Sequence, residues 1–466
     1  MKNLKTLTLV LPLALLGSTA LSTPALADAK DERIAALESQ MQMMMQEIQS
    51  LKSERVEEKQ AQAIMQQDLH EQLEEIEEKA AAQWASGLAP AAGNADDLKI
   101  TMAPGPKITK GDFEWQPFGR IHLDAAAFQD DKTDHPDGAE FRRARLGMKG
   151  KIAKDFGYKA EIDFANEGVA FKDVYVNYTG IDGVEIKAGS FKPAQGLEEM
   201  TSANYLTFIE RSAPTSAFMP GEIIGLGASG HGENWSVAGG VFNDDAGVQS
   251  TADEALSVTG RLTFAPINDE DSTLHLGGSA AYREPDSATD TFDFDAKAEN
   301  AVQSADSVSA LITTANSATI YGAEIAGVFG PISAQGEYFH VGVDNNAGAD
   351  SDLSGGYAQA AWTLTGERRP YKAGKGSFGR IVPDRPLDPS NGDWGAVELA
   401  ARYSTIDLTD GPVSGGEMDS YTAGINWYLN KHFRLMANYI VADTDSSAVT
   451  ADDDPQILLF RTQADF

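Results

Sequence analysis

The sequence has no cysteine, a small share of basic residues and no long apolar run after its N-terminus. The absence of cysteine excludes disulfide bonds and thiolate metal sites. The 466 residues include 37 lysines and arginines against 70 aspartates and glutamates, for a formal net charge of −33. That balance argues against a nucleic-acid partner, which needs a basic surface. No later stretch is long and apolar enough for a transmembrane helix.

Familiar catalytic motifs are missing as well. The sequence contains no G-x-S-x-G, H-E-x-x-H or Walker pattern. Its 7 histidines are scattered and offer no metal cluster. We therefore expect neither an enzyme nor a bound cofactor or metal.

Residues 1–27 have the composition of a secretory signal. Lys2 and Lys5 precede an apolar run, and a short A-L-A sequence ends at Ala27. A charged region, an apolar region and an A-x-A site in this order are typical of a cleaved signal peptide. The apolar run is too short for a membrane anchor. We predict an exported mature chain that begins at Asp28.

Residues 28–83 are expected to form a periplasmic coiled coil. From residue 30 they lack glycine and proline, and apolar residues recur at spacings of three and four. These positions are Ile34, Leu37, Met41, Met44, Ile48 and Leu51. An amphipathic helix packed on a domain is the alternative. A coil of this length would extend roughly 75 Å, which allows it to reach towards peptidoglycan. Residues 84–112, rich in Ala, Gly and Pro, are expected to be a linker.

From residue 113 onward, short segments alternate apolar and polar residues and are separated by turn residues. In one segment Ile121, Leu123 and Ala125 share one face, and polar residues occupy the other. Such alternation predicts strands with one apolar and one polar face. Sixteen segments fit this description: 114–128, 139–152, 157–166, 169–179, 183–192, 222–231, 234–243, 255–265, 272–284, 318–329, 332–343, 354–366, 393–407, 417–429, 432–443 and 455–466.

The connections between these segments alternate in length, being mostly short after even-numbered segments and longer after odd-numbered ones. Outer-membrane barrels show this parity, whereas a soluble β-sandwich does not predict it. Aromatic residues near segment ends fit membrane-interface belts: Phe118, Phe128, Tyr175, Tyr178, Trp427, Tyr428, Phe433 and Tyr439. We predict an all-β fold, a 16-stranded antiparallel transmembrane β-barrel over residues 113–466, preceded by the N-terminal α-helical coiled coil.

Four blocks of sequence resemble the phosphate-selective porin O and P family. They are "FRRARLGMKGKI", "FGYKAEIDFANEGVAFKDVYVNY", "EIKAGSFKPAQGLEEMTSANYLTFIER" and a block running from "LTGERRPYK" to "WGAVELAARYS". The resemblance covers roughly 113–466 and implies a homotrimeric 16-stranded porin in the outer membrane of a Gram-negative bacterium. It also implies passive diffusion of small anions, such as phosphate, through a constriction that inward-folded segments narrow and that Arg and Lys line.

The second predicted strand offers the best candidates for such a pore lining. Alternation places Arg143, Arg145 and Lys149 on the polar face, with neighbouring inward residues about 7 Å apart along the strand. Arg142 has the opposite parity but lies at the outer end, and the resemblance aligns the family's paired arginines with Arg142 and Arg143. The alternative is that these cations only balance the acidic side chains of the next strand.

Further candidate cations come from the first strand and from two connections. They are Arg120, then Lys192 at the start and Arg211 in the later half of the long connection 193–221, then Arg368, Arg369, Lys372 and Lys375. The last four belong to a basic segment, 367–392, on the side of the barrel where turns should be short. We expect this segment to fold into the pore, unless a strand pair has been miscounted.

The predicted outer loops are acidic, for example "DDKTDHPD" and "DTDSSAVTADDD". We interpret them as sites of divalent-cation bridging to lipopolysaccharide, or as a source of solubility. Their charge disfavours anion entry at low salt. Two alternatives therefore stay open beside an anion channel: a general or cation-preferring porin, and a tether whose coiled coil reaches peptidoglycan.

The chain ends on "ILLFRTQADF", in which apolar residues alternate with mostly polar ones back from Phe466. Because a barrel has no free edge, this last strand should pair with the first one near Phe118. A terminal phenylalanine also resembles the C-terminal signature that the barrel assembly machinery reads.

Overall fold

The computed structural model describes residues 98–102, 105–129, 131–165, 168–243, 254–303, 305–445 and 452–466. The predicted signal peptide, the predicted coiled coil and most of the expected linker lie outside these residues. All the described residues belong to one compact unit, 95–466. No helix in the described part has the length and apolarity needed to span a bilayer.

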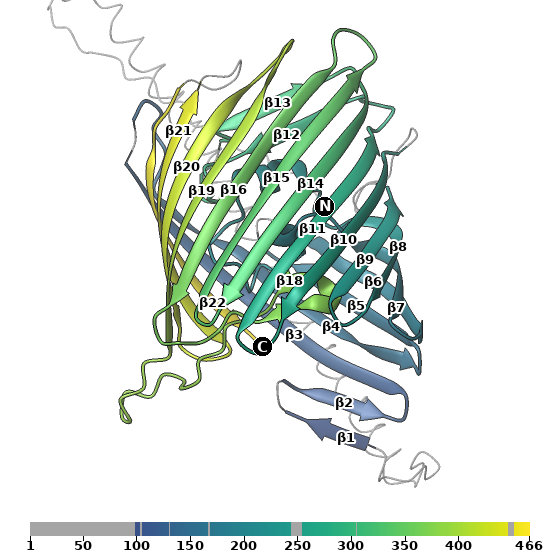
Figure 1. Cartoon of the computed structure of the whole chain (residues 1–466), viewed down its shortest axis with the longest axis vertical. Helices are drawn as coiled ribbons and strands as arrows, with labels where there is room; N and C mark the ends of the chain where they lie inside the picture. The colour runs from purple at the N-terminus through teal and green to yellow at the C-terminus, as the bar shows by residue number, and fades with distance from the viewer. Residues whose placement is uncertain are drawn as a thin grey trace, which may run out of the picture. The chain divides into compact units, whose positions relative to one another are not determined.

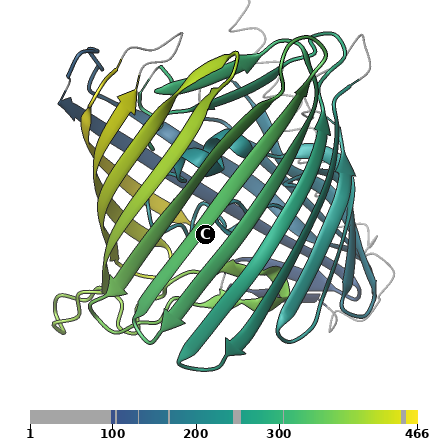
Figure 2. The same ribbon diagram turned by 45° about the horizontal axis from the view of Figure 1, so that its top comes forward.

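Sixteen antiparallel strands form a closed barrel (Figures 1 and 2). The first eight are β3 (Phe113–Gln129), β4 (Gly138–Ala153), β5 (Phe156–Asp163), β6 (Ala170–Ile181), β7 (Val184–Phe191), β8 (Ile223–His231), β9 (Trp235–Phe242) and β10 (Leu256–Asn268). The others are β11 (Ser272–Glu284), β14 (Ala315–Phe329), β15 (Ile332–Asn345), β16 (Ser351–Thr363), β19 (Ala396–Asp410), β20 (Val413–Tyr428), β21 (Phe433–Asp445) and β22 (Gln456–Asp465). The predicted barrel and its strand number are confirmed, whereas the predicted coiled coil lies outside the described residues.

The outer face of the barrel is apolar and carries two aromatic belts. Towards the long loops, Tyr282, Tyr321, Tyr338, Tyr403, Tyr421 and Tyr439 are exposed, and towards the short turns, Trp235, Phe264, Phe329, Trp362 and Phe433 are exposed. Such belts lie at the two membrane interfaces.

Four of the aromatic residues expected in the belts, Phe118, Phe128, Tyr175 and Tyr428, face the lumen instead; Phe128 packs against the apolar core inside the barrel. The Lys149 ammonium lies 5.6 Å from the Phe118 ring centre, and the Lys187 ammonium lies 5.1 Å from that of Tyr175. The Tyr428 hydroxyl donates to the buried Glu398. The strict period of two decides the face, so proximity to a strand end is not sufficient.

Three connections fold into the barrel. The β7–β8 connection contains α2 (Leu197–Met200) and α3 (Ala213–Phe218), and the β11–β14 connection contains the hairpin β12 (Phe292–Ala296) and β13 (Val308–Ile312). The β16–β19 connection contains β17 (Tyr371–Lys372), η2 (Ala373–Lys375) and β18 (Ser377–Phe378). Figure 1 shows β12 and β13 near the long-loop end and β18 near the short-turn end.

The basic segment 367–392 behaves as expected in its first half only. Phe378 is buried, and the carbonyl of Gly376 accepts a hydrogen bond of 2.7 Å from the wall residue Arg261. Beyond Ile381 most residues are exposed, including Val382 and Trp394. The prediction that this segment enters the barrel is confirmed for the part up to Ile381.

The interior of the barrel is not uniformly polar. A large apolar core fills the side formed by β14–β16 and β19–β22, where α3, β12 and β13 pack against the wall. Its fully buried members include Phe218, Phe294, Phe339, Ile406, Leu408, Ile440, Ile457 and Leu459. The open space inside the barrel that borders β7–β10 lies away from this core.

A short hairpin precedes the barrel inside the expected linker. Strands β1 (Leu98–Thr101) and β2 (Lys107–Lys110) pair with each other, and β2 continues the sheet beside the first residues of β3. Four-residue strands separated by a Gly/Pro-rich sequence carry too little alternation to be recognised.

The seam between the first and last strands confirms the predicted closing strand. β22 pairs with β3 from Gln456↔Gln129 to Asp465↔Arg120. Gly119 and Phe466 then exchange two backbone hydrogen bonds of 3.1 Å each. The Phe466 ring lies over Gly119, where a Cβ atom would approach a ring carbon to 2.5 Å. A larger residue at this position would displace the Phe466 ring from its place over the seam.

Candidate pore constriction

A β-bulge explains how two adjacent arginines on β4 both reach the lumen. Leu123 pairs with Phe141 and His122 pairs with Arg143, so Arg142 is the extra residue. The bulge directs Phe141 outward and releases Arg142 from strict alternation.

Both arginines bind the same carboxylate in the β7–β8 connection. Arg142 makes a two-pronged contact with Glu210, at 3.1 and 3.2 Å. The Arg143 Nη1 atom lies 3.3 Å from the Glu210 Oε1 atom. The pair therefore anchors the inward-folded connection to β4.

A third arginine, from the last strand, completes this anchor. Arg461 binds both oxygens of Asp124 at 2.6 Å and Oε1 of Glu210 at 2.5 Å. Burial opposes ionisation of Glu210, but the surrounding guanidinium groups outweigh it and hold its pKa well below the usual range. The carboxylate is thus charged at any physiological pH.

The remaining wall arginines of the first three strands are neutralised by β5. The Arg120 Nη2 atom lies 3.0 Å from Glu161, and Arg145 Nε donates to Asp163 at 2.6 Å. For these two cations the structure matches the alternative of charge balance across neighbouring strands.

Carboxylates also compensate the cations at the two ends of the β7–β8 connection. Arg211 Nε lies 2.8 Å from Glu199, and Lys192 forms an ion pair with the same carboxylate. Across the lumen, Glu337 on β15 accepts the backbone N–H groups of Leu197 and Glu198 at the start of α2. The connection is held by charged contacts on several sides.

The arginines of the β16–β19 connection contact the wall as well. Arg369 donates to the Gln335 side chain at 2.7 Å and lies 4.0 Å from the centre of the Phe378 ring. Arg368 donates to the Thr273 hydroxyl at 2.5 Å. These contacts place both guanidinium groups in structural roles.

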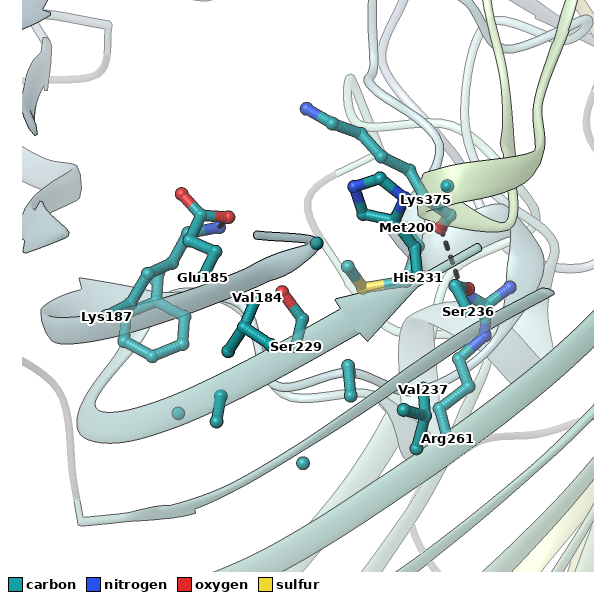
Figure 3. Close-up of a pocket in the computed structure, with 18 of the residues that line it drawn as sticks. Val184, Glu185, Lys187, Met200, Ser229, His231, Ser236, Val237, Arg261 and Lys375 are labelled. Carbon is teal, nitrogen blue, oxygen red and sulfur yellow. Dashed lines mark hydrogen bonds and ion pairs between the residues drawn. The ribbon is translucent and has the colours of Figure 1, made fainter. Parts of the chain in front are cut away.

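Five cations border open space, and three of them, Lys187, Lys192 and Arg261, also form ion pairs with carboxylates. A cavity of about 710 Å³ lies between β7–β10 and the β16–β19 connection, and its lining includes Lys187, Lys192, Arg261, Lys372 and Lys375 (Figure 3). Arg261 is bound to Glu324 at 2.8 Å and to the carbonyl of Lys375 at 3.3 Å.

Lys149, Lys372 and Lys375 are exposed to the lumen and form no ion pair with the described carboxylates. The barrel wall that surrounds Lys375 and the ammonium groups of Lys187, Lys372 and Lys149 lower the pKa of its amine. We name Lys149, Lys372 and Lys375, together with Lys187, whose ammonium lies 3.2 Å from the Glu185 carboxylate, the lumen lysine cluster.

Sequence reasoning missed several residues that the geometry brings into the constriction. The wall cations Lys187, Arg261, Arg402 and Arg461 have lumen parity, so alternation could have identified them. Glu299 lies in a loop and gave no such signal. Within the described ranges, no group of three or more His, Cys, Asp or Glu side chains could hold a metal ion.

Comparison with known proteins agrees with this architecture. The model of the family "phosphate-selective porin O and P" matches residues 117–466. Porin O of Pseudomonas aeruginosa is 29% identical over 421 residues, covering 79% of this chain and 92% of that protein. An uncharacterized protein of Caulobacter vibrioides is 31% identical over 377 residues, covering 76% of this chain and 73% of its own length. The solved structure of Pseudomonas putida OprB superposes with a TM-score of 0.51 at 8% identity, over 76% of this chain and 94% of that one.

Proposed function

Because the chain belongs to the phosphate-selective porin O and P family, we propose that it is an outer-membrane channel for small anions, with selectivity set by the lumen lysine cluster. The observation that carries the proposal is the contrast between compensated arginines and uncompensated lysines. Cations already bound to carboxylates present little net charge to a passing ion. Lys149, Lys372 and Lys375, by contrast, are open to lumen water and form no ion pair with a described carboxylate, so no carboxylate offsets their charge.

The position of the cluster also favours this role. Lys149 lies on β4 and Lys187 on β7, and both influence the ionisation of Lys375 from the β16–β19 connection. The passage therefore runs between cations on its wall and cations on an inward-folded segment. Ammonium groups act as point charges that attract an anion without the two-pronged grip of arginine, which favours release. Phosphate or a similar anion is the solute that the family name suggests.

The proposal includes a homotrimer embedded in outer-membrane lipid and lipopolysaccharide, inserted by the barrel assembly machinery. The heptad pattern of residues 28–83 supports a periplasmic coiled coil that associates three chains or extends to peptidoglycan.

The purified protein in a planar bilayer tests the proposed selectivity. In a tenfold KCl gradient we expect a reversal potential whose sign shows that chloride is more permeant than potassium. We also expect added phosphate to reduce the chloride current, because both anions bind to the same lysines. A reversal potential whose sign shows that potassium is the more permeant ion, or a value near zero, would instead favour a cation-preferring or general porin. The absence of conductance from a correctly folded barrel would favour a tether.

A further inference from the structure

Glu299, in the β11–β14 connection, combines a strained backbone with a fully engaged side chain. It has a φ of 51°, which side-chain-bearing residues rarely adopt, and it is 4% exposed. Its carboxylate accepts hydrogen bonds from Arg402 Nε at 3.0 Å and Arg402 Nη2, from Ser404 at 2.6 Å, from Thr422 at 2.9 Å and from the Ala213 N–H at 3.4 Å. Backbone strain of about 1–3 kcal/mol persists only where surrounding contacts enforce it.

The donors to Glu299 come from different parts of the barrel. Arg402 and Ser404 lie on β19, Thr422 lies on β20, and Ala213 is the first residue of α3 in the β7–β8 connection. One carboxylate thus joins the β11–β14 connection to the wall and to the other inward-folded loop.

Arg402 extends the same contact to the β7–β8 connection. Its Nη1 atom lies 3.3 Å from the Glu198 carboxylate and donates to the carbonyl of Glu210 at 3.1 Å. Glu198 in turn accepts the backbone N–H and the hydroxyl of Ser212, each at 2.9 Å. Both loops are therefore held by the same guanidinium group.

Apolar packing around the β12–β13 hairpin does not fix the position of the loops in this way. Phe294 lies against Phe218 with ring centres 5.9 Å apart, and both belong to the apolar core. Apolar contacts hold a loop against a surface but tolerate sliding and rotation more readily than a buried ion pair with several fixed donors. Arg402 on β19 and Thr422 on β20 tie Glu299 to the part of the wall that is opposite in strand order to the β7–β10 wall lining the cavity.

We propose that Glu299 is a positioning residue that, through Arg402, holds the β7–β8 and β11–β14 connections against the β19–β20 wall and so keeps the ion passage along β7–β10 open and steady. Without this contact the strained turn at residue 299 relaxes, the two loops fluctuate into the passage, and the open-channel current becomes unsteady.

The variant Glu299→Gln tests the proposal because its amide keeps the shape of the side chain and removes the charge that pairs with Arg402. In single-channel recordings of the full-length protein we expect at least a roughly twofold increase in open-channel current noise, with sub-conductance states, as loop opening becomes more frequent. Asp293→Asn is the matched control, since Asp293 is exposed on β12 and the same unit of charge is removed from the same loop.

Both variants are first compared for barrel integrity by the heat-dependent shift in gel mobility that folded barrels show. Glu299→Gln with the same noise and sub-states as Asp293→Asn would overturn the proposal. If Glu299→Gln does not assemble, Ser404→Ala removes one donor and leaves the ion pair. Ser404→Ala should increase the current noise above that of the wild type, by less than the roughly twofold increase expected for Glu299→Gln. Current noise equal to that of the wild type in Ser404→Ala would refute the positioning role.

Discussion

The double variant Lys372→Glu/Lys375→Glu is expected to shift the reversal potential in a salt gradient towards the cation side. The two substitutions replace two positive charges that face lumen water with two negative charges. Both residues belong to the β17–η2 segment inside the barrel, so the change acts on ions in passage. A change of about 1.4 kcal/mol in the energy of an ion in the passage corresponds to a tenfold change in the permeability ratio. The double variant changes the local charge by four units in total, which should produce at least about this effect.

The matched control is Lys99→Glu/Lys110→Glu. These lysines are exposed on the β1–β2 hairpin and the double variant makes the same change in net charge. It should leave the reversal potential close to that of the wild type. Equal reversal potentials for the two double variants would show that the lysines of the β16–β19 connection do not govern selectivity.

The single variant Arg461→Ala is expected to cause the largest loss of stability. Asp124 and Arg461 are almost completely buried at the β3–β22 seam and bind through two hydrogen bonds. Removing the guanidinium group leaves the Asp124 carboxylate buried without its partner, a change that costs about 3–5 kcal/mol in comparable ion pairs. The midpoint of the heat-dependent gel-mobility shift, or of unfolding in guanidinium, measures the effect.

Two further variants separate the ion pair from a general effect of charge removal. Arg385→Ala removes an exposed arginine from the part of the β16–β19 connection beyond Ile381 and should change the midpoint little. Asp124→Asn/Arg461→Gln removes both charges and should recover part of the loss, because no charge is left unpaired. An Arg461→Ala midpoint close to that of Arg385→Ala would contradict the proposed role of the seam pair.

The barrel could be predicted from the sequence because its strands obey a strict period of two. Ile121, Leu123 and Ala125 face outward in β3, as the alternation indicates, and β22 closes the sheet as expected. The alternation was less informative about the lumen: Leu459 has inward parity, yet it lies in an apolar core and not beside water. Parity assigns a side chain to a face, and only the packing of the inward loops decides what that face contacts.

The constriction was predictable in its residue types but not in its pairings. Arg142 and Arg143 were expected at the pore, and they reach the lumen through a bulge that sequence alone does not reveal. Their partner Glu210 is 67 residues from Arg143 along the chain. Contacts over such separations depend on how the loops fold back, so the distinction between compensated arginines and open lysines required coordinates.

The apolar side of the lumen has a thermodynamic consequence. When a barrel with a water-filled interior unfolds, little additional apolar surface from its interior becomes exposed to water. Unfolding of this barrel also exposes the buried apolar surface around Phe294, Phe339 and Ile406. Each Å² of apolar surface hydrated on unfolding raises the heat capacity by about 0.45 cal/K/mol. The stability of this protein should therefore depend on temperature with stronger curvature than that of an open porin, and fall more steeply on cooling below its optimum.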